Sequence, residues 1–299
     1  MTTKPAMTSS LLLAACLVAV LAGCSNRAAS TPGGSAVPSG PVIEAPSSPE
    51  QACQVTDSRL TELSGLAASI QHPGILWTHN DSGDSARVFA LDAQTCKVRA
   101  VVRLAGVSTR DAEAIAVGNT ADGTPVLWLG DIGDNSATAS SVRIYRFKEP
   151  TQIKDQTVKV AATITVKYAD EPYNAEALIV SPSPAGRIWI ATKREATQGA
   201  YYELPASVWG GSRTVTVRPT GSVPALTTDA AYAPDGQHYV IRTYFGGTQF
   251  RGAPPGEDPV ELDIGFRGQG EAITYSYDSR FLYAISEGED NPLMKIPLP

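Results

Sequence analysis

The feature that most constrains the fold is a short motif that recurs five times along the chain. Each copy combines a polar or acidic residue with small and apolar residues, and a second apolar stretch follows after a turn rich in Gly, Pro or Asp. β-Branched and aromatic residues fill these stretches, and no helical periodicity of useful length appears, which favours strands. The chain is therefore expected to be an array of similar all-β units. The five copies begin at Glu62, Asp111, Asn174, Thr228 and Gly270.

Each unit is predicted to contain four strands. Second strands are expected to begin at Ile75, Val126, Arg187, His238 and Phe281. Third strands are expected at Arg87, Val142, Ala200 and Leu293, with a poorly defined one near Gln249. Fourth strands are expected over 97–104, 157–166, 214–219 and 259–264.

Repeats of this length with four strands each are typical of β-propeller blades. We predict an all-β propeller of five four-stranded blades, with six blades as the main rival. A β-sandwich is a weaker rival because it does not explain why the opening motif recurs. Trp77, Trp128 and Trp189 recur at matching places on the second strands, where we expect them to fill the gaps between blades.

The fifth unit contains only three strands before Pro299. Its missing outer strand is expected from the N-terminal side of the array, around Gln54 to Leu60. Such closure across the termini removes the exposed sheet edge that an open array would carry.

In a propeller, the first strand of each blade starts on the face where the second strand ends, so residues at these positions converge around one funnel. Carboxylates gathered there repel one another unless a cation, a basic side chain or protons neutralise them. The arrangement is interpreted either as a structural ring of salt bridges or as a mixed-charge pocket for an anionic ligand or a metal. The predicted funnel residues are Glu113, Glu176, Asp229, Glu271, Lys193 and Arg242.

Two loops repeat a pattern in which Asp residues flank a Gly. They are Asp81 to Asp84 and Asp131 to Asp134. Carboxylate oxygens at such turns suit a hard cation such as Ca²⁺. The alternative is a β-turn that favours Asp and Gly for backbone reasons. Asp81, Asp84, Asp131 and Asp134 are therefore candidate ligands of Ca²⁺ or another divalent cation.

The segments beginning at Leu76, Asp111, Leu129 and Asn174 together resemble a group of secreted bacterial propellers, related in pattern to phytase-like and gluconolactonase-like propellers. The resemblance covers nearly all of the predicted domain and is specific for the fold. Phytase-like relatives imply Ca²⁺ and phosphomonoester hydrolysis. Lactonase-like relatives imply one divalent cation at the funnel floor, whereas Lys193 and Arg242 depart from that pattern.

The N-terminus carries an export signal. An uncharged apolar run from Leu11 to Ala22 is too short for a stable bilayer span. It leads into Leu-Ala-Gly-Cys24, which resembles the bacterial lipobox. We expect residues 1–23 to be a signal peptide, and 24–50 a lipid-modified Cys24 followed by a disordered Ser/Pro/Gly tether. Residues 51–299 are expected to form the propeller, held on the extracytoplasmic face of the cell membrane by acyl chains.

Cys16 leaves with the signal and Cys24 is acylated, so Cys53 and Cys96 remain in an oxidising compartment. Two such cysteines are expected to form a disulfide.

The net charge is −6 without basic clusters, which argues against nucleic acid as a partner. We expect a monomer whose partners are the membrane and a small anionic ligand or an envelope component.

Catalytic motifs are sparse, and no catalytic residue is assigned. His79 is the one histidine predicted near the funnel, and no nucleophile elbow, phosphate loop or zinc spacing occurs. Three hypotheses follow, in this order. The first is a propeller that binds a ligand or cation at its funnel, the second a metal-dependent phosphoesterase or lactonase, and the third a non-catalytic scaffold.

Overall fold

The computed structural model describes residues 43–265, 269–288 and 290–299, which belong to one compact unit. The predicted signal peptide, Cys24 and most of the tether lie outside the described residues. Contacts with the domain begin upstream of Gln51, because Ile43 packs in a core cluster and its carbonyl accepts a hydrogen bond from Arg280. No helix of the described part is long and apolar enough to cross a membrane.

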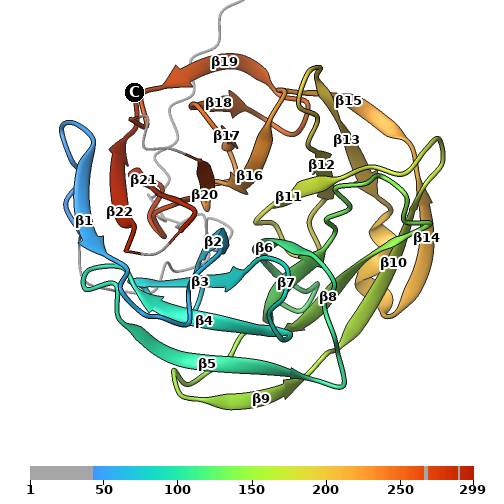
Figure 1. Ribbon diagram of the computed structural model, residues 1–299, viewed down its shortest axis with the longest axis horizontal. Coiled ribbons are helices and arrows are strands. Elements are labelled where there is room, and N and C mark those ends of the chain that lie inside the picture. Colours follow the sequence, from blue (N-terminus) through green and yellow to red (C-terminus); the bar gives the residue numbers. More distant parts are fainter. Residues whose placement is uncertain (1–42, 266–268, 289) are drawn as a thin grey trace, which may run out of the picture. The chain divides into compact units, whose positions relative to one another are not determined.

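The described chain is a five-bladed β-propeller, as predicted (Figure 1). The innermost strands of blades 1 to 5 contact one another in a closed ring, so that blade 5 returns to blade 1. These inner strands are β2 (Leu63–Ala68), β6 (Ala112–Asn119), β11 (Ala175–Val180), β16 (Thr227–Tyr232) and β20 (Gly270–Tyr275).

The second and third strands of each blade follow outward in antiparallel order. The second strands are β3 (Ile75–Asn80), β7 (Pro125–Asp131), β12 (Ile188–Thr192), β17 (His238–Thr243) and β21 (Phe281–Ser286). The third strands are β4 (Arg87–Asp92), β8 (Val142–Lys148), β13 (Gly199–Leu204), β18 (Gly247–Arg251) and β22 (Pro292–Pro297).

Outer strands complete the four-stranded blades. They are β5 (Val98–Ala105), β10 (Ala162–Tyr168), β15 (Pro219–Val223), β19 (Glu257–Leu262) and β1 (Glu50–Gln54). Burial follows from this order, because inner strands are covered on both faces by neighbouring blades and read as continuous apolar runs. β2 and β11 are buried at every residue, whereas the outer strand β10 alternates between buried and more exposed residues.

Ring closure uses the N-terminal strand, although at a different place from the one predicted. β1 (Glu50–Gln54) pairs antiparallel with β22, so the first and last strands of the chain lie side by side (Figure 1). Of the predicted segment, Gln54 to Leu60, only Gln54 belongs to β1, and residues 55–60 form the connection to blade 1. Val55 and Leu60 in that connection are buried, which explains its strand-like composition.

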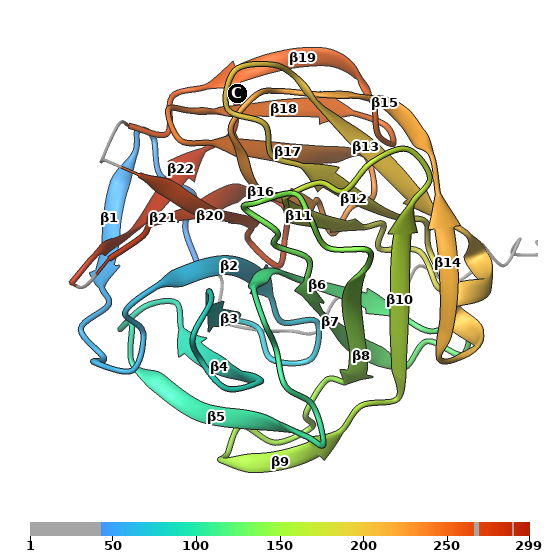
Figure 2. The same ribbon diagram turned by 45° about the vertical axis from the view of Figure 1, so that its right-hand side comes forward.

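Two blades carry a fifth strand that the sequence did not predict. The stretch 157–166 is divided between β9 (Gln156–Lys159), which runs parallel to β5 of blade 1, and β10 of blade 2. Likewise β14 (Arg213–Val217) runs parallel to β10, so the fourth strand of blade 3 is β15 and not 214–219 (Figure 2). These added strands cover the sheet edges of blades 1 and 2, which open edges would leave free to pair with other chains.

Arg146 contacts the segment between β13 and β14 through a hydrogen bond and through cation–π interactions. The 3-10 helix η1 (Ala206–Gly210) precedes it, and the Trp209 carbonyl accepts a 2.7 Å hydrogen bond from Arg146 Nη1. The Arg146 guanidinium lies 5.4 Å from the Trp128 ring and 5.6 Å from the Trp209 ring. Trp77, Trp128 and Trp189 are all buried between blades, as predicted.

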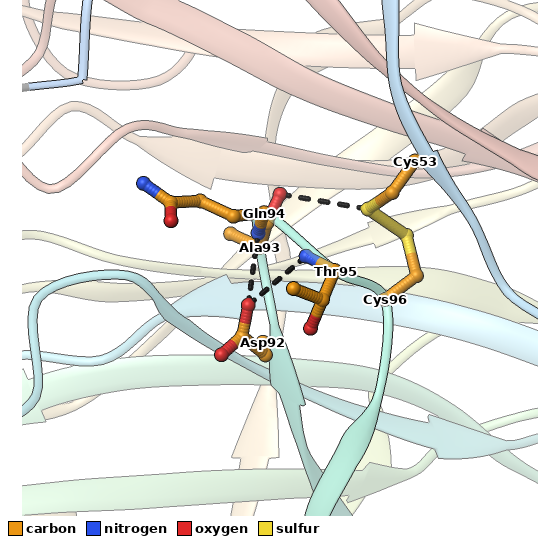
Figure 3. Close-up of a disulfide and its surroundings, with 6 residues drawn as sticks. All are labelled: Cys53, Asp92, Ala93, Gln94, Thr95 and Cys96. Atoms are coloured by element: carbon orange, nitrogen blue, oxygen red, sulfur yellow. Dashed lines mark hydrogen bonds between the residues drawn. A yellow bond between two sulfur atoms is a disulfide. The ribbon is translucent and has the colours of Figure 1, made fainter.

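The predicted disulfide is present. Cys53 in β1 is bonded to Cys96 in the turn between β4 and β5, with a Cα–Cα separation of 5.6 Å (Figure 3). Asp92 shapes this turn by accepting hydrogen bonds from the backbone N–H groups of Gln94 and Thr95. The disulfide therefore joins blade 5 to blade 1 at the closure of the ring.

Candidate functional site

A β-bulge lies near the start of every inner strand, at the same place in all five blades. A bulge places two residues of one strand opposite one residue of its partner and re-aims the extra side chain. Here it creates five equivalent positions at the end of the ring where the inner strands begin. The residues at these positions are Ser64, Glu113, Glu176, Thr228 and Glu271.

A polar cavity of about 130 Å³ opens at this end of the ring, and we call it the funnel pocket. Its acidic lining residues are Glu62, Asp81, Glu113, Glu176, Glu271 and Glu287. Lys193 is the single basic residue among the described lining residues. Ser64, Asn135, Tyr244 and Gln269 supply neutral polar groups. The charge balance of the pocket is thus strongly negative.

Four of the six predicted funnel residues line this pocket: Glu113, Glu176, Glu271 and Lys193. Asp229 and Arg242 do not. In blade 4 the bulge falls on Thr228, so Asp229 lies one residue beyond the position of Glu113 in blade 2. The sequence alignment placed Asp229 in register with the glutamates because an acidic residue precedes Ala there, and a bulge cannot be read from residue types.

Asp229 is a fully buried carboxylate that links three blades. It accepts backbone hydrogen bonds from Ile273 at 2.8 Å, from Ala230 at 2.8 Å and from Leu66 at 3.4 Å. Burial raises the pKa of Asp229 well above its ordinary value, although these donors oppose the shift. Asp229 therefore satisfies strand-edge N–H groups at the centre of the ring and is not exposed to a ligand in the pocket.

Arg242 is also buried, and its guanidinium lies against the backbone of Gly270. A Cβ at Gly270 would come within 2.5 Å of Arg242 Nη2, so only glycine permits this approach. Burial lowers the pKa of Arg242 to about 10, while Glu271 and Asp229 oppose that shift. Arg242 thus supplies positive charge to the wall behind Glu271 without lining the pocket.

Three carboxylates form a compact group between blades 1 and 2. One ligand atom from each of Asp81, Asp111 and Glu113 lies within 4.8 Å of the other two. Gly133 allows this approach, because a Cβ at Gly133 would stand 2.4 Å from Asp111 Oδ2 and 2.8 Å from Glu113 Cγ. We call Asp81, Asp111 and Glu113 the carboxylate triad.

Asp84, Asp131 and Asp134, the other three candidate metal ligands, lie outside the triad, and Asp84 and Asp134 bond to residues in or beside their own loops. Asp84 accepts hydrogen bonds from Asn80 Nδ2 and Arg87 Nε. Asp134 Oδ2 accepts the backbone N–H of Ala139. Asp84 Oδ1 also accepts the backbone N–H of Ser85, so both residues have the backbone role considered as the alternative for the two loops.

Asp131 has a supporting place next to the triad. Its Oδ1 accepts the backbone N–H groups of Arg110 and Asp111, both at 2.8 Å. These bonds hold the chain just before the bulge of blade 2, and thereby help to position Asp111 and Glu113.

Glu113, Asp81 and Glu271 in the pocket have raised pKa values and hold protons more tightly than ordinary carboxyls. Burial, with Glu176 next in size, raises the pKa of Glu113 well above its usual range. Burial raises the pKa of Asp81 to about 7, with Asp111 contributing. Burial and then Glu176 raise the pKa of Glu271 to about 7. Burial is the largest cause of each shift, and neighbouring carboxylates add to it.

Lys193 forms an ion pair with Glu176 within blade 3 and a hydrogen bond to Tyr244 of blade 4. Its Nζ lies 2.7 Å from each carboxylate oxygen of Glu176 and also donates to the Tyr244 hydroxyl. Burial alone would lower the pKa of Lys193, but Glu176 reverses this and the pKa is raised. Burial raises the pKa of Glu176 to about 7, although Lys193 opposes the shift. An ammonium has three N–H donors, and these contacts use all three.

His79, predicted to approach the funnel, lies outside the pocket lining. It is 1% exposed, and a Cβ at Gly65 would come within 2.7 Å of its Nε2. Burial lowers the pKa of His79 to about 4, so the imidazole is neutral near pH 7. We conclude that His79 is a packed core residue.

Several pocket residues were missed or left unassigned by the sequence reasoning. Glu62, Asp111 and Gln269 each lie two positions before a bulged residue, and Asn174 occupies the same position in blade 3. That recurrence is visible in the repeats and could have identified these residues. Tyr244 directly follows β17, the position that Asp81, Lys193 and Glu287 occupy after the second strands of blades 1, 3 and 5, so the same kind of recurrence could have identified it.

A scan against protein-family models and a search of curated proteins both find no match to the chain. Among solved structures, a glucose dehydrogenase matches with a TM-score of 0.51 at 12% identity, over 84% of this chain and 99% of that chain. The gluconolactonase of Xanthomonas campestris matches with a TM-score of 0.44 at 15% identity, over 82% of this chain and 89% of that chain.

Hydrazine synthase of Kuenenia stuttgartiensis matches with a TM-score of 0.42 at 10% identity, over 74% of this chain. The match spans 61% of the hydrazine synthase chain. The chain has a β-propeller fold. The glucose dehydrogenase match supports this fold, and identities this low assign no activity.

Proposed function

We propose that the funnel pocket binds a divalent cation that prefers oxygen ligands, with Ca²⁺ as the first candidate. The carboxylate triad carries this proposal, because three carboxylates from two blades converge within 4.8 Å. Hard cations of this class take carboxylate, carbonyl, amide and water oxygens. Asp81, Asp111 and Glu113 would hold the ion, and the Asn135 side chain lies in the same lining.

The charge balance favours a cation over the anionic ligand considered from the sequence. Six carboxylates and one ammonium line the pocket. The three N–H groups of that ammonium already donate hydrogen bonds to Glu176 and Tyr244. An anion would therefore meet repulsion without a free positive partner in the described lining. A bound divalent ion would offset this repulsion and could then hold an oxygen of a small polar ligand.

A metal-dependent hydrolase is the second candidate function. The observation that favours it is Glu271, which lines the same pocket and has a pKa raised to about 7 by burial and by Glu176. A general base is most effective when its pKa lies near the working pH. Glu271 would accept a proton from a water molecule, and the cation would polarise the reacting group.

The stability of the cation-free protein should depend on pH, because carboxyl groups of the pocket have raised pKa values. Between about pH 4.5 and 7 the folded pocket retains protons that the unfolded chain has released, because burial raises the pKa of Glu271 and Asp81 to about 7. Stability is therefore greatest below the ordinary carboxyl pKa and falls as pH rises towards about 7. In chelator, the Tm should decrease from pH 5 to pH 8.

Calcium should counteract this decrease. At pH 8, Ca²⁺ at a hundred times its Kd should stabilise the fold by about 2.7 kcal/mol. At pH 5 the effect should be much smaller, because protons compete for the carboxylates. Thermal unfolding measures both arms, with NaCl of equal ionic strength as the control. An identical response to CaCl₂ and NaCl at pH 8 contradicts the proposal.

We further propose that the domain is held on the extracytoplasmic face of the cell membrane through a lipid on Cys24. The support is the sequence around Cys24 and the apolar run before it. Labelled palmitate should be incorporated into the full-length protein in a bacterial host, and Cys24→Ser should abolish both the label and membrane fractionation. Equal labelling of the Cys24→Ser variant contradicts the anchor.

A further inference from the structure

The funnel pocket contains a cation of its own, the ammonium of Lys193. Lys193 directly follows β12 of blade 3, and its backbone N–H is bonded to the Asn174 carbonyl. Its Nζ makes two 2.7 Å contacts with Glu176 and a third contact with the hydroxyl of Tyr244 from blade 4. The ammonium thus occupies, on the blade 3 side of the pocket, a place comparable to the open carboxylate triad on the side of blades 1 and 2.

Glu176 is held in this arrangement from two directions. Asn174 Nδ2 donates to Glu176 Oε1 at 3.2 Å, and Lys193 takes both oxygens. Glu176 is only 4% exposed, and Glu271 is close enough for its pKa to rise under the influence of Glu176. Without the ammonium, Glu176 would keep only the Asn174 donor among its described contacts while lying near the buried Glu271, an arrangement that demands another cation or a proton.

We propose that Lys193 determines how many ions the pocket holds, because its ammonium occupies the Glu176 carboxylate, which would otherwise help to bind a second divalent cation beside Glu271. The inference rests on the proposed cation function for the first ion. Lys193 is then a built-in counter-ion, and the native pocket binds one divalent ion per chain at the carboxylate triad.

The test compares the full folded domain with Lys193→Met, which removes the charge and keeps an unbranched side chain of similar length. Isothermal titration with CaCl₂ at pH 8 gives the number of ions bound, since most pocket carboxyls are ionised there. The wild type is expected to bind one Ca²⁺ and Lys193→Met two. Lys193→Arg keeps the positive charge and should remain at one.

Equal stoichiometry of the wild type and Lys193→Met, with both proteins folded, overturns the inference. Should the wild type bind no Ca²⁺ while Lys193→Met binds one, the cation function fails and the role of Lys193 stands. The two claims are therefore separable by a single pair of titrations.

A second variant covers the case in which Lys193→Met folds only with Ca²⁺. The double variant Glu176→Gln with Lys193→Met removes the ion pair as a whole, so it should fold in chelator and bind one Ca²⁺. Far-UV circular dichroism and the same titration measure both properties. A second ion in the double variant contradicts the inference, because the site would then not depend on Glu176.

Discussion

Glu113→Gln should lower the affinity for Ca²⁺ by about 100-fold or more. Even the loss of an outer partner of a metal ligand costs about 10- to 100-fold in affinity, and Glu113 is one of the three converging carboxylates. Isothermal titration at pH 8 measures the change. Asp84→Asn is the matched control, because Asp84 lies in the same loop as Asp81 but bonds to Asn80 and Arg87 instead of joining the triad.

The same substitution should make the cation-free protein more stable. Glu113 is 3% exposed, so burial raises its pKa, and charge repulsion from Glu176, Asp81 and Asp111 adds to the shift. A neutral amide removes that repulsion and can still contact Ser64, whose hydroxyl lies 3.1 Å from Glu113 Oε2. A variant that is less stable in chelator and binds Ca²⁺ as tightly as the wild type would favour the scaffold hypothesis instead.

Removing the disulfide should produce the largest loss of stability. The Cys53→Ser and Cys96→Ser double variant loses a cross-link between residues 43 positions apart, and such links contribute about 2–4 kcal/mol. For a domain of this size, that loss corresponds to a decrease in Tm on the order of 5–15 °C. The cause is local to the ring closure, because β1 completes blade 5 and Cys96 belongs to blade 1.

Urea unfolding of the oxidised wild type and of the double variant measures this loss. A reductant should destabilise the wild type and leave the double variant unchanged, which separates the cross-link from the substitutions themselves. Equal midpoints for the two oxidised proteins would show that β1 closes the ring without help from the disulfide.

Repetition made the architecture predictable. The opening motif occurs five times, and an apolar second strand follows each copy, with a Trp in three of them. Equivalent sequences need equivalent environments, and the blades of a closed ring provide such environments. The disulfide followed from cysteine number and the predicted compartment, since the predicted loss of Cys16 and acylation of Cys24 leave Cys53 and Cys96. Glu113, Glu176, Glu271 and Lys193 were placed around one opening because propeller topology brings equivalent strand ends together.

The features that escaped prediction depend on non-local geometry. β9 and β14 pair with blades other than those they adjoin in sequence, and nothing in their composition specifies that partner. Asp229 was assigned to the funnel because it precedes Ala, as the glutamates do. The assignment was wrong because the bulge of blade 4 falls on Thr228, one residue earlier. Asp84 and Asp134 were proposed as ligands although Asp in a turn has a sufficient role in hydrogen bonding to the backbone and nearby side chains.

The most direct test of the central claim is anomalous diffraction from crystals soaked in Mn²⁺, an oxygen-preferring divalent ion that can replace Ca²⁺. The funnel account predicts one strong anomalous peak per chain among the oxygens of Asp81, Asp111 and Glu113. An empty triad in crystals that bind Mn²⁺ elsewhere on the chain would contradict it.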